Sequence, residues 1–275
     1  MKAARYAYVS AESVAQACGL LHDGGGMAKV LGGGQSLGPM MNLRLVQPEL
    51  LVDVRALAAL NQCSATADAV TLGAATTHAA IEDGKVDDAT QGLMPFVASA
   101  IAYRAIRNRG TLGGSLAHAD PSADWVNLMP LLDAQIVVLG PTGERTVRAA
   151  DWMLGAFTTV LRDDELISAV RIDRLSERAR WSYYKVQRKA GEYADALAGF
   201  VSDPLRAVCR GLIGATDGRP HVFAAEPLLG RWDADYAHTQ LRAAGLKADT
   251  YEYRIHAVAL ERAAAQLRQK FAVAP

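Results

Sequence analysis

The first part of the chain alternates apolar and polar positions in a pattern that predicts a small α/β unit. A stripe of apolar residues with helical spacing begins after Ser10, which can cap the helix, and ends at Asp23 and the glycines that follow it. The stripe consists of Val14, Ala17, Cys18 and Leu21. Short apolar runs at residues 28–31 and 50–54 predict two buried strands.

Beyond residue 56 the pattern changes to shorter strands, and then to a sheet followed by helices. We expect strands at 69–74, 135–139, 166–172, 181–187 and 206–214, and helical stretches at 93–106, 233–244 and 251–271. In the last stretch an amphipathic stripe is formed by Tyr253, His256, Leu260, Ala264, Leu267 and Phe271. This order predicts an α+β fold in three parts: an α/β unit at 1–55, a mainly β unit at 56–174, and a sheet with helices at 175–275.

Composition narrows the possible functions. The 275 residues include 29 lysines and arginines and 29 aspartates and glutamates, so no net charge attracts nucleic acid or an anionic membrane. No apolar run reaches the roughly 18 residues of a membrane span, and polar residues interrupt a possible signal peptide, so we expect a soluble, cytoplasmic protein. Three scattered cysteines, histidines without metal-ligand spacing and the lack of a recognisable nucleophile motif predict no metal site and no catalytic residue in this chain.

Two glycine-rich segments, at 29–40 and 109–117, carry the most information. Successive glycines allow main-chain N–H groups to point into one concavity, where they can hold a phosphate. Neither segment contains the Gly-Lys-Ser/Thr of a Walker A loop or the Gly-x-Gly-x-x-Gly of a Rossmann turn. The alternative is that each segment is only a tight turn after a strand.

With these motifs the sequence resembles the FAD-binding medium subunit of the molybdenum hydroxylases, the family of xanthine dehydrogenase and aerobic carbon monoxide dehydrogenase. The family's Ala-Gly-Gly-x-Ser-Leu is found at 32–37, with glycine in place of the alanine. Its Thr-Ile-Gly-Gly-Asn/Ser is found at 111–115, and its His-Ala-Asp-Pro-Ala-Ala-Asp at 118–124 with one serine. The resemblance extends over nearly the whole chain.

The resemblance implies a two-subdomain FAD-binding fold of the vanillyl-alcohol oxidase (PCMH) type, followed by a C-terminal antiparallel sheet with helices. FAD would lie between the first two parts, with both glycine segments gripping its pyrophosphate. Asp124 would contact the ribityl hydroxyls, or would simply be an acidic residue in the first turn of a helix. The residues expected to bind the cofactor are Lys29, Val30, Leu31, Gly32, Gly33, Gly34, Gln35, Ser36, Leu37, Ile101, Thr111, Gly113, Gly114, Ser115, His118, Asp124, Leu166, Lys185 and Tyr193.

Within that set the resemblance implies individual roles. Ile101 would lie near the adenine, His118 would line the ribityl channel and Tyr193 would lie against the ring. Leu166 and Lys185 would lie near the edge of the isoalloxazine, where a cation favours the anionic reduced ring.

The resemblance also implies partners and a role in electron transfer. A large subunit with a molybdenum-pterin cofactor and a small subunit with 2Fe-2S clusters would form a dimer of heterotrimers with this chain. Electrons would pass from the clusters to FAD and on to an external acceptor. Two alternatives stay open, a stand-alone flavoprotein oxidoreductase and a non-catalytic nucleotide-binding assembly module, and neither the substrate nor the acceptor follows from the sequence.

Overall fold

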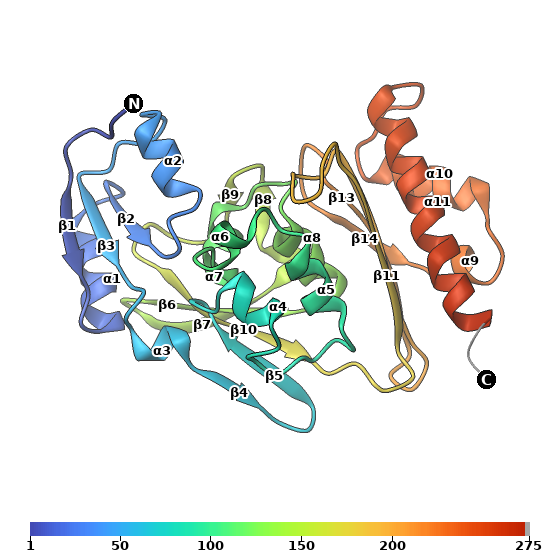
Figure 1. Cartoon of the computed structure of the whole chain (residues 1–275), viewed down its shortest axis with the longest axis horizontal. Coiled ribbons are helices and arrows are strands. Elements are labelled where there is room, and N and C mark those ends of the chain that lie inside the picture. Colours follow the sequence, from blue (N-terminus) through green and yellow to red (C-terminus); the bar gives the residue numbers. More distant parts are fainter. Residues whose placement is uncertain (273–275) are drawn as a thin grey trace.

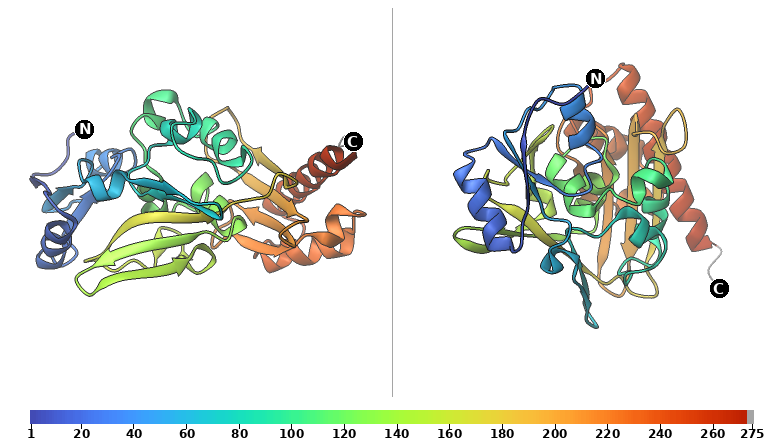
Figure 2. Two further views of the ribbon diagram at one scale, coloured as in Figure 1. Left: turned by 90° about the horizontal axis from the view of Figure 1, so that it is seen from below. Right: turned by 60° about the vertical axis from the view of Figure 1, so that its left-hand side comes forward.

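The computed structural model describes residues 1–272, and the side chains of residues 1–270. Three sheets follow one another along the long axis of the molecule, with the N-terminus at one end and the last helix at the other (Figure 1). The left view of Figure 2 shows the same succession from below. Among the described residues, no helix is long and apolar enough to cross a membrane.

The N-terminal sheet is small and entirely parallel, with the order β1-β3-β2. Its elements are β1 (Ala7–Ser10), α1 (Val14–Asp23), β2 (Ala28–Leu31), α2 (Leu37–Asn42) and β3 (Leu50–Asp53). The predicted stripe of α1 faces the core, where Ala17, Cys18 and Leu21 are buried with Val52. The predicted cap was wrong: Ser13 caps α1 by accepting from the Gln16 N–H, whereas Ser10 ends a strand that pairs with β3.

The middle part is built on a five-stranded antiparallel sheet with the order β4-β5-β10-β6-β7. These strands are β4 (Cys63–Ala65), β5 (Ala69–Gly73), β6 (Gln135–Gly140), β7 (Gly143–Arg148) and β10 (Leu166–Asp173), with the short pair β8 (Met153–Gly155) and β9 (Thr158–Thr159) outside the sheet. The helices are α3 (Ala58–Asn61), α4 (His78–Glu82), α5 (Leu93–Ser99), α6 (Arg104–Arg107), α7 (Leu112–His118) and α8 (Asp124–Leu131), with a 3-10 turn, η1 (Ala149–Asp151). All residues of α8 are buried, so this helix forms the centre of the largest core.

The helical stretch expected at 93–106 is two helices rather than one. Helix α5 ends at Ser99 and α6 begins at Arg104, because Ala102 between them adopts a left-handed conformation with a φ of 44°. No glycine or proline marks this break in the sequence. The irregular segment between the helices lines the cavity described below.

The C-terminal part is a four-stranded antiparallel sheet with the order β11-β12-β13-β14. Its strands are β11 (Arg180–Val186), β12 (Ala196–Asp203), β13 (Val208–Gly214) and β14 (His221–Ala224). The sequence pattern missed β12, because this strand is buried on both faces and does not alternate. Leu197 packs into the middle core, whereas Ala198 and Phe200 pack into the core under the last helices.

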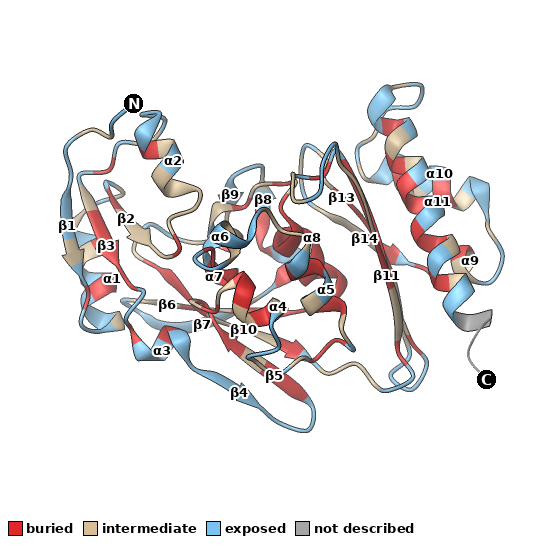
Figure 3. Ribbon diagram, viewed as in Figure 1, coloured by how far each residue is buried: buried red, intermediate tan, exposed pale blue. Residues whose placement is uncertain are grey.

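Three helices cover the outer face of this sheet: α9 (Glu226–Leu229), α10 (Ala234–Ala243) and α11 (Tyr251–Ala272). Figure 3 shows the buried stripe along α11. Its members include the predicted residues Tyr253, His256, Leu260, Ala264 and Leu267, while the side chain of Phe271 lies outside the described residues. The sheets thus fall within the three predicted parts, and the domain boundaries themselves stay a prediction.

Candidate functional site

A cavity of about 780 Å³ lies where the N-terminal unit faces the middle part. Both glycine segments line it, together with residues from the 101–102 segment and from the loop at 191–193. Of the residues expected to bind a cofactor, the structure places all but Leu31 and Lys185 in its wall. Residues separated by more than 150 positions in sequence therefore share one enclosure of the size that proteins use for small molecules.

The first glycine segment leaves its main-chain amides free. Among the described residues, no backbone or side-chain acceptor takes the N–H groups of residues 32–37, which follow β2 directly. Gly34 adopts a φ of 72°, a left-handed conformation that glycine reaches without strain. A run of main-chain donors without acceptors in the protein, at the wall of a cavity, can hold an external anion.

The two glycine segments touch through their backbones. A Cβ placed on Gly33 would lie 2.1 Å from the Arg109 carbonyl oxygen and 2.7 Å from Cα of Gly110. A Cβ on Gly32 would lie 3.3 Å from the Thr111 hydroxyl. Glycine is therefore required at position 33 by the approach of another chain segment, and not only by the volume of a phosphate.

The second glycine segment differs from the expectation that it would also offer free amides. The N–H groups of residues 112–115 all donate within the protein. Their acceptors are the carbonyls of Thr76 (2.9 Å), Ala74 (2.9 Å) and Thr111 (3.0 Å) and the hydroxyl of Thr111 (3.0 Å). This segment therefore lines the cavity without offering free amides there, and two of its amides join the start of α7 to residues 74 and 76, which follow β5.

Asp124 and Lys185 form a buried ion pair beside the cavity. The Lys185 ammonium lies 2.9 Å from one Asp124 oxygen, and the Tyr183 hydroxyl donates to the other at 3.1 Å. Burial raises the pKa of Asp124, and Lys185 opposes that shift. Asp124 is both the first residue of α8 and a wall residue, so the two readings of its role are compatible. The carboxylate of Asp124 therefore neutralises the charge of Lys185.

Several wall residues were not anticipated from the sequence. His78 is buried and its Nδ1 accepts from the Trp125 indole at 2.9 Å, and burial, with a smaller effect of Arg107, lowers its pKa to about 4. Arg55 is held by Asp53, whose pKa it lowers to about 2. Phe157 lies against the ring of His118, with ring centroids 5.2 Å apart. These residues lie outside the glycine motifs in sequence, so the motifs did not indicate them, although the His78 N–H donates to the Gly110 carbonyl at 3.0 Å.

His256 is held by main-chain carbonyls from its own helix and from the end of β13. His256 is buried and lies within hydrogen-bond distance of three main-chain carbonyls, those of Glu252, Gly214 and Ala215. Within residues 1–272, no group of three or more metal-ligating side chains is arranged to hold a metal ion.

Comparisons with known proteins place these features in context. A family model described as "FAD binding domain in molybdopterin dehydrogenase" matches residues 4–174. The carbon monoxide dehydrogenase medium chain of Hydrogenophaga pseudoflava is 36% identical over 192 residues, 70% of this chain and 67% of that protein. The nicotine 6-hydroxylase medium subunit of Paenarthrobacter nicotinovorans is 37% identical over 196 residues, again 70% and 67%. The aligned region spans about two thirds of each relative's own length.

Among solved structures, the quinoline 2-oxidoreductase of Pseudomonas putida 86 has a chain that superposes with a TM-score of 0.85 at 30% identity. The superposition covers 98% of this chain and 99% of that one. The C-terminal sheet and helices, which the family model does not reach, therefore share the fold of that structure.

Replacing Gly33 by alanine tests the contact between the glycine segments. We expect Gly33→Ala to lower FAD occupancy at least tenfold, because the new Cβ forces the main chain of residues 109–110 away from the first segment. Gly38→Ala is the matched control, since a Cβ at Gly38 meets nothing within 4 Å. Equal flavin absorbance per protein in both purified variants would contradict this assignment.

Replacing Lys185 by methionine tests the buried pair. We expect Lys185→Met to lower the free energy of unfolding at pH 7 by about 3 kcal/mol, because Asp124 keeps an uncompensated charge. The loss should shrink as the pH falls toward 4, since protonation of Asp124, whose folded-state pKa is raised, removes that charge. Urea denaturation measures the effect. The double variant Asp124→Asn/Lys185→Met should have a higher free energy of unfolding than Lys185→Met alone. If the double variant instead loses the sum of the free energies lost by the two single variants, the pairing is refuted.

Proposed function

This chain belongs to the family of FAD-binding domains of molybdopterin dehydrogenases, and from this premise we propose that it is the FAD-binding, electron-transferring subunit of a molybdenum-containing hydroxylase. The observation that carries the proposal is the run of unpaired N–H groups at residues 32–37, facing a cavity between two units.

The residues present fit FAD at each part of the cavity. The amides of residues 32–37 can hold the diphosphate without a cationic side chain, and the Ser115 hydroxyl can complete its coordination. The buried Asp124 can accept from ribityl hydroxyls with the face that Lys185 and Tyr183 leave free. Ile101 and Tyr193 supply apolar and aromatic surface for the planar ring systems.

The protein itself would bind FAD, orient it and shield it from water. FAD supplies the redox chemistry, because it takes up and releases one or two electrons. The Asp124–Lys185 pair places no net charge beside the cavity while its carboxylate is ionised, so we expect Lys185 to affect the flavin potential less than an unpaired cation would. His78, neutral near pH 7, lines the cavity, and the Trp125 indole behind it donates to its ring.

The partners follow from the family as part of the same proposal. A large subunit with molybdenum-pterin would oxidise the substrate, a small subunit with 2Fe-2S clusters would relay the electrons, and this chain would pass them to an external acceptor. The assembly would be a dimer of heterotrimers in the cytoplasm. The substrate is chosen in the large subunit, so the relatives' carbon monoxide and nicotine chemistry does not transfer to this chain.

Reconstitution tests the cofactor. We expect the purified chain to take up FAD at one equivalent, with an oxidised-flavin absorption band, and to bind riboflavin at least a hundredfold more weakly, because riboflavin lacks the diphosphate that residues 32–37 hold. Calorimetry measures both affinities. Equal affinities would contradict the assignment of residues 32–37 to the diphosphate. No flavin binding at all would contradict the proposal and favour a nucleotide-binding assembly module.

Isolation from the native source tests the electron-transfer role. We expect the chain to purify with a molybdenum subunit and an iron–sulfur subunit, and its FAD to be reduced by substrate only when both are present. Reduction of the isolated flavoprotein by a small organic substrate would instead indicate a stand-alone oxidoreductase.

A further inference from the structure

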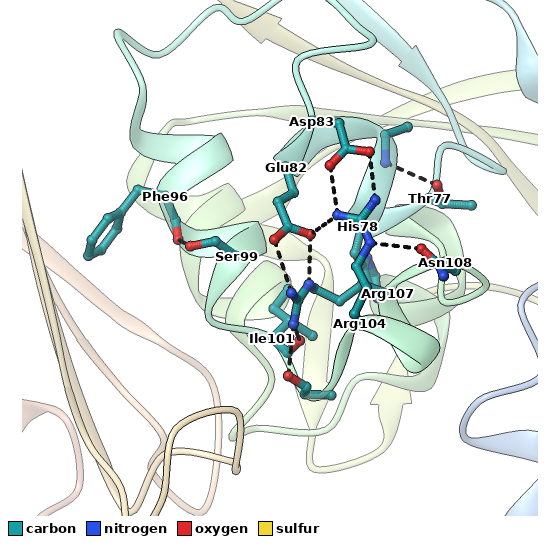
Figure 4. Close-up of polar contacts among 12 residues, drawn as sticks. Thr77, His78, Glu82, Asp83, Phe96, Ser99, Ile101, Arg104, Arg107 and Asn108 are labelled. Carbon is teal, nitrogen blue, oxygen red and sulfur yellow. Dashed lines mark hydrogen bonds and ion pairs between the residues drawn. The ribbon is translucent and has the colours of Figure 1, made fainter.

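The guanidinium of Arg107, which lies outside the cavity, donates hydrogen bonds to the carbonyls of two residues in the cavity wall. Arg107 in α6 is only 12% exposed, and its Nε and Nη2 donate to the two oxygens of Glu82 in α4 at 2.8 and 2.9 Å. Its Nη1 donates to the carbonyl oxygens of Ile101 (3.0 Å) and Ala102 (2.9 Å). Figure 4 shows Arg107 between Glu82 and Ile101. All three guanidinium nitrogens of Arg107 therefore donate, through four hydrogen bonds.

The two carbonyls belong to a segment that needs such support. Ala102 has a left-handed φ of 44°, which a non-glycine residue adopts at a cost. The segment lies between two short helices and belongs to neither. Arg107 offsets this cost because charged donors form strong hydrogen bonds to both carbonyls.

The 101–102 segment also contacts the loop that contains Tyr193. The Ala102 N–H donates to the Gly191 carbonyl at 2.9 Å. A Cβ on Gly191 would lie 2.6 Å from the Ala102 carbonyl oxygen, so the two backbones pass in direct contact. Gly191, Glu192 and Tyr193 all line the cavity, whereas Arg107 does not.

We propose that Arg107 is a positioning residue: through Ala102 and Gly191 it sets the place of the 191–193 loop, and with it Tyr193, at the cofactor cavity. The consequence for FAD rests on the proposed function, whereas the effect on the loop does not. Lysine cannot replace Arg107 fully, because one ammonium lacks the planar fork that reaches Glu82 and both carbonyls together.

Arg104 provides a matched control within the same cluster. Its guanidinium donates to Asp83 at 2.6 and 2.7 Å and to Glu82 at 2.8 Å, and it is 48% exposed. Among the described residues, Arg104 makes no hydrogen bond to the 101–102 segment. Removing either arginine leaves the other on Glu82, so a difference between the two variants isolates the contact with the carbonyls.

The first experiment needs no cofactor. The loop that follows β11 exposes Arg188 and Lys189, and limited trypsin digestion of the full chain, read by mass spectrometry, measures how often this loop opens. We expect cleavage there to rise about tenfold in Arg107→Met, to change less than twofold in Arg104→Met, and to be intermediate in Arg107→Lys. Gly191→Ala should reproduce the increase, because its Cβ strikes the Ala102 carbonyl. Equal cleavage rates in Arg107→Met and Arg104→Met would overturn the proposal.

The second experiment tests the link to Tyr193. We expect Arg107→Met to weaken FAD binding about tenfold in the parent chain but less than threefold in a Tyr193→Ala background, because the loop then has nothing to position. Independent, additive effects would show that Arg107 does not act through Tyr193. If the parent chain binds no FAD, the proposed function fails, while the cleavage result still decides whether Arg107 holds the loop.

Discussion

The backbone contact between Gly33 and residues 109–110 is the constraint on which the site depends. Through this contact the N-terminal unit, with its parallel sheet, meets the middle part, with its antiparallel sheet. Glycines of both parts, Gly33 and Gly110, meet there. Any side chain at position 33 would separate them, and the cavity would lose one wall. The position of the cavity therefore follows from a packing requirement between two folded units, and its polarity from the amides that this packing leaves exposed.

The two glycine segments are similar in composition but differ in the hydrogen bonding of their main-chain amides. Residues 32–37 follow a strand and donate to no acceptor within the described chain, so they offer an anion site. Residues 112–115 begin α7, and their amides are taken by Thr111 and by carbonyls of the middle part. Gly113 is needed there because a Cβ would lie 2.6 Å from the Ala74 side chain. The first segment thus has amides available for a ligand, whereas the amides of the second maintain the fold.

Much of this architecture could be predicted from the sequence, and the failures have physical reasons. The stripes of α1 and α11 and the strands β2, β5 and β10 follow from periodicity, because each has one buried face or a short apolar run bounded by turns. Strand β12 was missed because both of its faces are buried, and the break at Ala102 was missed because the Arg107 hydrogen bonds that stabilise it come from outside the segment. The glycine motifs indicated the cavity, but the pairing of Asp124 with Lys185, residues 61 positions apart, is a tertiary contact that no local pattern contains.

Hydrogen exchange of the main-chain amides on FAD binding tests the central claim most directly. If the diphosphate is held by the first segment, peptides covering residues 32–37 should gain strong protection, whereas the amides of 112–115, already bonded within the protein, should change little. Protection confined to 112–115, or bound FAD without any protection at 32–37, would contradict the account.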